Sequence, residues 1–171
     1  MDIASIPSPR LCAVMHYVVA RTAGAGFGAV KLNKAIVAAD REFYRRYGRT
    51  VTGAASFQKL QHGPVPNGIR VAGKQLKDDG KIADHRVLTP VGTRAEFISL
   101  HEPDLRGFSA EEIDVLNMAI ASLERLSAQE ASDQTHDALW DETEMTGQIP
   151  VSAAAFPPGQ IDPEALAWAN G

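Results

Sequence analysis

Cysteine is almost absent from this sequence. Cys12 is the only one among 171 residues, so the chain can form neither an internal disulfide nor a cysteine-rich zinc site. No two of the five histidines have the i, i+4 spacing that places a pair of zinc ligands on one helix. They are His16, His62, His85, His101 and His136. We therefore expect a cytoplasmic protein that uses no metal and no other cofactor.

Long apolar runs are also lacking. No stretch approaches the roughly 20 apolar residues that a helix needs to span a bilayer. The first residues are not typical of a signal peptide, because they include Asp2 and two prolines, and His16 interrupts the apolar run of residues 11–20. We expect no membrane segment, and we interpret this run as a capped helix.

Motifs for nucleotide binding and catalysis are missing as well. Residues 24–28 are rich in glycine, but they follow an expected helix and lack the third glycine of the dinucleotide motif, which favours an interhelix loop. No serine lies in a G-x-S-x-G elbow. His136, near Asp133 and Asp137, could be a general base. A structural contact with Trp140, four residues later, is the simpler interpretation, so we expect no enzyme.

Positive and negative charges are unevenly distributed. Residues 1–101 carry 15 Lys/Arg and 7 Asp/Glu, a balance of +8, whereas residues 102–171 carry 2 and 14, a balance of −12; together they give the net charge of −4. Such asymmetry indicates either a charged partner surface or two halves that neutralise each other inside the fold.

Two helices are expected in the first 50 residues. Ser8 and Pro9 form a typical helix start, and the apolar stripe that follows consists of Leu11, Val14, Met15 and Val18. A second helix is expected over residues 29–47, ended by Gly48. Its expected buried stripe is Leu32, Ile36, Phe43 and Tyr47. Basic residues decorate its other faces, as a solvated surface or as a nucleic-acid contact; they are Lys31, Lys34, Arg41, Arg45, Arg46 and Arg49.

Later segments alternate between turns, strands and helices. The Pro/Gly-rich residues 61–68 predict a rigid turn, followed by a helix over 67–79 and a hairpin of strands 82–88 and 94–100. Two capping boxes, Ser109 with Glu112 and Ser127 with Glu130, predict helix starts. Residues 149–151 read as extended, and a last short helix is expected at 162–169. The expected fold is mainly α with a small antiparallel β element (α+β), in a single compact domain over residues 1–171.

The order of these motifs resembles the Panacea domain of SocA-like antitoxins. The matching segments are Lys31–Asp40 with Phe43, Tyr44, Tyr47 and Gly48; Gln58–Pro66; Ser109–Asp114; Ser127 and Ala128 with Thr135, His136 and Trp140; and Ile149–Val151. The resemblance covers about residues 10–155 and leaves a tail of about residues 156–171. Because only about nine residues precede the first expected helix, we expect none of the amino-terminal modules that many members carry.

The resemblance implies an antitoxin of bacterial or phage origin that neutralises a toxin, often encoded nearby, by direct protein contact. A SocA-type member would instead act as an adaptor that delivers its toxin to the ClpXP protease. A regulator that contacts nucleic acid through the second helix is a further alternative, which we do not favour. Neither a membrane nor a cofactor is implied.

Candidate partner-binding residues lie on the stiff turn and the basic helix, because a pre-ordered loop loses little entropy on binding. They are Lys31, Lys34, Lys59, His62, Pro64, Pro66, His136 and Trp140. The acidic half offers a second candidate surface, or a solvated one that aids solubility. It consists of Glu111, Glu112, Asp133, Asp137, Asp141, Glu142 and Glu144.

Overall fold

The first helix begins where the sequence predicts. The computed structural model describes residues 6–134, 141 and 143–155. Helix α1 (Pro9–Arg21) is capped by Ser8, whose side-chain oxygen accepts a hydrogen bond from the Leu11 amide at 3.3 Å. The whole expected apolar stripe of α1 is buried. This helix therefore supplies one wall of the core.

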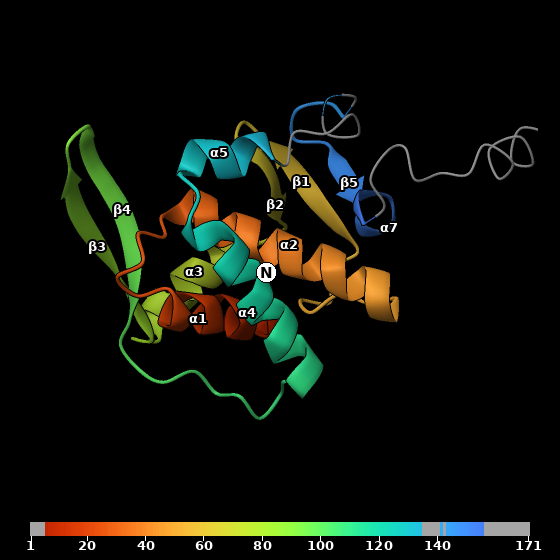
Figure 1. Cartoon of the computed structure of the whole chain (residues 1–171). Coiled ribbons are helices and arrows are strands. Elements are labelled where there is room, and N and C mark those ends of the chain that lie inside the picture. The colour runs from red at the N-terminus through yellow and green to blue at the C-terminus, as the bar shows by residue number, and fades with distance from the viewer. Residues whose placement is uncertain (1–5, 135–140, 142, 156–171) are drawn as a thin grey trace, which may run out of the picture.

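Helix α2 (Ala29–Tyr47) lies at the centre of the fold (Figure 1). It contacts α1, α4, α5, α7 and strand β2. It ends at Gly48, which adopts a left-handed conformation with φ of 69° that suits glycine. Leu32, Ile36 and Phe43 are buried as expected, but the prediction for Tyr47 is wrong. Tyr47 is 50% exposed, and its ring lies 4.5 Å from the buried Phe43 ring between centroids.

The segment expected to be a rigid turn forms part of a small sheet, because it contains strand β2. Strands β1 (Ser56–Leu60), β2 (Gly63–Pro66) and β5 (Gln148–Pro150) make an antiparallel sheet in the order β2-β1-β5. Leu60 pairs with Gly63, so the chain reverses over two residues. Strand β2 tolerates its two prolines because it is an edge strand and needs hydrogen bonds on one side only.

The second hairpin projects away from the helices (Figure 1). Helix α3 (Ile69–Asp78) leads into strands β3 (Ile82–Thr89) and β4 (Gly92–Ser99), which pair along their full length. Helix and hairpin agree with the sequence prediction within two or three residues. The root of the hairpin is anchored by Ile82, which is buried in the core, while Leu88 and Val91 near the tip are exposed.

Both capping boxes are confirmed. They start α4 (Ala110–Glu124) and α5 (Ala128–Asp133). Val151, expected to be extended, begins the short helix α7 (Val151–Ala154). The predicted helix at 162–169 and the predicted contact of His136 with Trp140 lie outside the described residues.

Most of the buried apolar side chains form one cluster around α1, α2 and α4. A smaller cluster lies between α2, β1, β5 and α7, with Phe57 at its centre. The fold is mainly helical with small antiparallel sheets packed into one compact domain, as the sequence predicts. In the described part of the chain, no helix is both long and apolar enough to cross a membrane.

Candidate functional site

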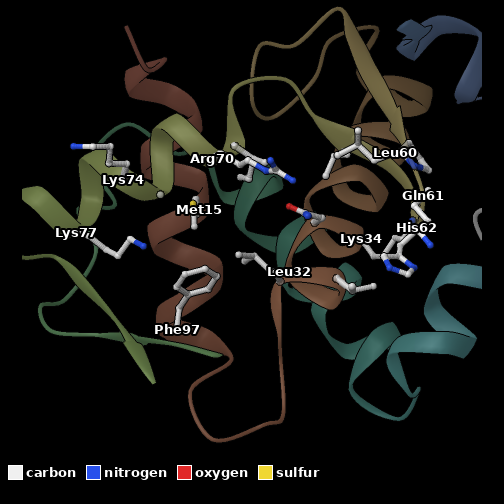
Figure 2. A pocket seen from close by; sticks show the side chains of 18 residues that line it. Met15, Leu32, Lys34, Leu60, Gln61, His62, Arg70, Lys74, Lys77 and Phe97 are labelled. Carbon is white, nitrogen blue, oxygen red and sulfur yellow. The ribbon is translucent and has the colours of Figure 1, made fainter. Parts of the chain in front are cut away.

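A groove of about 570 Å³ opens between the first turns of α2, the β1–β2 hairpin, α3 and the root of β4 (Figure 2). Its apolar lining comes from six elements and includes Met15, Leu32, Leu60, Val65, Ile69 and Phe97. Since these residues are far apart in the sequence, the groove exists only in the folded domain.

Basic side chains surround this apolar lining. They are Lys34, His62, Arg70, Lys74 and Lys77, and no Asp or Glu is among the described residues that line the groove. In Figure 2, Arg70 and Lys77 point toward the middle of the groove, whereas Lys74 points away from it. Lys74 pairs with Asp78 and Lys77 with Asp84, at 2.5 and 3.1 Å. Arg70 makes no ion pair within the described part of the chain.

The burial of Lys34 distinguishes it from the other basic residues. Its side chain comes from α2 and only 2% of the residue is exposed. Burial, and secondarily the charge of Arg41, lowers the pKa of Lys34 to about 8, because a low-dielectric environment disfavours the ammonium form. Lys34 still carries its charge at neutral pH and adds a positive group to the groove wall.

Lys31 is buried as well, so the expectation that both lysines lie on a solvated face is wrong. The Lys31 ammonium lies 4.6 Å from the centre of the Phe27 ring and 3.5 Å from the Glu124 carbonyl oxygen. Burial lowers its pKa. It faces the loop between α1 and α2, and it does not line the groove. The long aliphatic stems of lysines make such burial possible, which a helical-wheel pattern cannot reveal.

The predicted residues of the β1–β2 hairpin divide into two groups. His62 and Pro64 line the groove, and the His62 carbonyl oxygen accepts a hydrogen bond from the Ser132 hydroxyl of α5 at 2.9 Å. Lys59 and Pro66 do not line it. Lys59 is buried and its ammonium donates to the Thr143 carbonyl oxygen at 2.8 Å. A partner-binding role for Lys59 and Pro66 stays a prediction.

The residues that sequence reasoning missed are on α3. Arg70, Lys74 and Lys77 follow i, i+4, i+7 spacing, which places them along one helical face. This basic stripe was visible in the sequence, but nothing local marks it as the wall of a groove. His136 and Trp140, the other two candidates, lie outside the described residues.

A second concavity surrounds an ion-pair cluster. The Glu112 carboxylate is buried and contacts Arg10 at 2.6 Å and Arg49 at 2.8 Å, and it also accepts the Ser109 amide at 2.9 Å. Burial alone raises the pKa of Glu112, but these hydrogen bonds together hold it below its ordinary value. The cluster joins α1, α4 and the end of α2, so its role is structural.

His16 and the cysteine of the described residues have structural surroundings. Among the described residues, no group of three His, Cys, Asp or Glu side chains could hold a metal ion. The buried His16 ring bonds to the Ser99 hydroxyl and the His101 carbonyl oxygen, both at 3.0 Å. Cys12 is partly buried, and burial raises the pKa of its thiol, which disfavours the reactive thiolate.

The described part of the chain is thus a mainly helical domain with an apolar groove that basic side chains border. The family model described as antitoxin SocA-like, Panacea domain matches residues 32–141. This is more than half of the chain, and the chain belongs to that family. The match confirms the resemblance seen in the motif order, although it is shorter than the expected core of residues 10–155. No curated protein and no solved structure matches the chain.

Proposed function

We propose that this protein is an antitoxin that neutralises a partner toxin by direct protein–protein contact, and that the groove between α2, the β1–β2 hairpin and α3 is the contact surface. The family supports the antitoxin role. The apolar, basic groove supports direct binding, because nearly all of its lining falls within the matched residues. In this proposal residues 10–155 act as one binding unit in the cytoplasm and the protein catalyses no reaction.

Direct protein binding is favoured over nucleic-acid binding, because basic side chains of helix α2 are buried or form ion pairs. Lys31 and Lys34 are buried. Arg45 and Arg46 both pair with Glu42, at 3.0 and 2.7 Å. Since phosphate contacts need exposed, uncompensated cations, this face offers little to a nucleic-acid backbone.

The proposal is tested by expressing this chain together with a toxic protein encoded beside its gene. We expect growth to be restored, and the two purified proteins to elute as one complex in size-exclusion chromatography. Restored growth without a complex would contradict direct neutralisation.

The adaptor alternative is separated by measuring the toxin level in the same cells. Direct neutralisation leaves the toxin present in a complex, with growth restored equally in a host that lacks the ClpXP protease. Rescue that disappears in that host, with the toxin accumulating, would show that the chain delivers its partner for degradation.

A further inference from the structure

The size of the groove limits what it can hold. A volume of about 570 Å³ lies within the roughly 300–1,000 Å³ of ordinary ligand pockets. It accommodates a few side chains of one segment, while a whole domain must remain outside. A partner protein therefore engages the groove with a short stretch of chain, as in helix-in-groove and extended-peptide recognition.

The lining sets the composition of that stretch. Leu32, Leu60 and Val65 contribute aliphatic surface to the lining, and Phe97 contributes an aromatic ring. Contact with such surface is favourable for apolar side chains, because both partners lose unfavourable exposure to water. The segment must therefore carry Leu-, Ile-, Val- or Phe-like residues.

The charge of the groove determines which residues the partner segment carries at its other positions. Arg70 points into the groove without an ion pair in the described part of the chain, and Lys34 adds a buried positive charge. Lys77 points in the same direction, although it forms an ion pair with Asp84. With no carboxylate in the described lining, a partner carboxylate gains charge-assisted hydrogen bonds there, whereas a partner Lys or Arg is repelled.

We propose that the groove binds an acidic, amphipathic segment of the partner toxin, in which Asp or Glu residues alternate with aliphatic or aromatic ones. This rests on the proposed function and specifies the partner chemistry of the same site. A single-stranded nucleic acid is also anionic, but it binds through aromatic stacking platforms. Of the described residues that line the groove, Phe97 is the only Phe, Tyr or Trp, and most of its apolar neighbours are aliphatic.

The experiment is a selection with a random 12-residue peptide library displayed on phage, using the immobilised full-length chain. We expect enriched peptides with an excess of Asp and Glu over Lys and Arg and with two or more of Leu, Ile, Val, Phe or Trp. Synthetic versions should bind the Arg70→Glu/Lys77→Gln variant at least tenfold more weakly. The matched control Arg106→Glu/Lys81→Gln carries the same charge change away from the groove and should bind like the unmodified chain.

Circular dichroism and thermal unfolding of both variants show whether the fold is retained. If the Arg70→Glu/Lys77→Gln variant unfolds, Arg70→Gln alone replaces it, with a weaker but measurable loss of binding. Enrichment of basic or uncharged peptides, or no enrichment over a blank surface, would overturn the proposal. So would equal binding to both variants, or displacement of the peptides by a 12-nucleotide oligouridine at similar concentration.

These outcomes are distinct from failure of the proposed function. If the cognate toxin binds the unmodified chain but no acidic peptide is selected, direct neutralisation stands and the acidic segment is wrong. If acidic peptides bind the groove and the toxin forms no complex, the groove chemistry stands and the antitoxin mechanism fails.

Discussion

Asp40 is the most deeply buried acidic side chain in the described part of the chain, with 0% exposure. One carboxylate oxygen accepts the Thr52 amide at 2.9 Å and the other accepts the Thr52 hydroxyl at 2.5 Å. Burial nevertheless raises the pKa of Asp40 to about 6 and outweighs these hydrogen bonds, because desolvation penalises the charged form. Asp40 thus ties α2 to the loop that leads into β1.

This pKa gives the protein a specific pH dependence. Because the folded pKa is higher than the ordinary value, the folded state binds a proton between about pH 6 and pH 4 that the unfolded chain does not. The contribution of Asp40 to the free energy of unfolding therefore falls as pH rises from about 4 to about 7, on the order of 2–3 kcal/mol. Asp40→Asn removes this titration. In urea unfolding, the free energy of unfolding of the variant, relative to that of the unmodified protein, should therefore be higher at pH 7 than at pH 4.5. If the stability of the two proteins changed with pH in parallel, the raised pKa of Asp40 would be contradicted.

The pH dependence that Glu112 contributes to stability has the opposite sign. Its folded pKa is lowered by Arg49, the Ser109 amide and Arg10 against the effect of burial, so its stabilisation is present above its ordinary pKa and is lost as pH falls through the lowered value. We expect Glu112→Gln to reduce the free energy of unfolding at pH 7 by about 1–3 kcal/mol, and by less below pH 4. The neighbouring Glu111→Gln is the control, because Glu111 is exposed and should change stability by no more than about 0.5 kcal/mol. Equal losses in both variants would exclude the ion-pair cluster as the cause.

At the scale of elements, Lys59 of β1 makes three contacts with the segment that leads into β5. Its backbone amide donates to the Gly147 carbonyl oxygen at 2.9 Å, and its own carbonyl oxygen accepts the Thr146 amide at 3.0 Å. Its ammonium also bonds to the Thr143 carbonyl oxygen. One residue of β1 therefore fastens the segment that leads into β5, which is 84 residues away in the sequence.

Charge reversal at Lys59 should loosen that segment. Lys59→Glu places a buried carboxylate against a carbonyl oxygen, and we expect a loss of about 2–4 kcal/mol in the free energy of unfolding. Hydrogen exchange should become faster at the Thr146 amide, while amides inside α1 keep their relative protection. Lys59→Met retains the apolar stem and should cost less than Lys59→Glu. Unchanged exchange at Thr146 would show that the ammonium contact does not fasten the segment.

For the whole molecule, the uneven charge is neutralised in part inside the fold. Between described residues of the basic first half and the acidic second half, two ion pairs converge on Glu112. Glu112 is therefore not part of an acidic binding surface, which corrects the sequence-based hypothesis for that residue. Exposed acidic residues remain at Glu111, Asp133, Asp141 and Glu144, and Asp137 and Glu142 lie outside the described residues.

Partner binding should accordingly depend on salt. Between 50 and 500 mM NaCl we expect affinity for the toxin to fall on the order of tenfold, because screening weakens exposed charge pairs. Calorimetric titrations of the Arg70→Glu/Lys77→Gln variant should show a shallower salt dependence. If the variant keeps a steep salt dependence, the exposed acidic residues are indicated as the binding surface. An affinity that does not depend on salt would count against both the groove and the acidic residues as the binding surface.

Much of the local structure was predictable because its causes are local. Ser8, Ser109 and Ser127 cap helices through atoms within three residues of each other, and Gly48 ends α2 because glycine adopts a left-handed conformation at little cost. The family was also predictable, since the ordered motifs extend along most of the chain. Tyr47 was misplaced because a helical period shows which face is apolar, but it does not show where the core stops.

The sequence by itself therefore determined helices α1 to α4 and the start of α5, the serine caps, the β3–β4 hairpin, the mainly helical class and the Panacea family. Only the tertiary structure decided that Lys31 and Lys34 are buried, that Asp40 and Glu112 lie at junctions between elements, and that Arg70 and Lys77 line one groove with Leu60 and Val65. The reason is physical: backbone capping and helical periodicity act over a few residues, whereas burial, ion pairing and the shape of a groove depend on which distant segments are packed against one another.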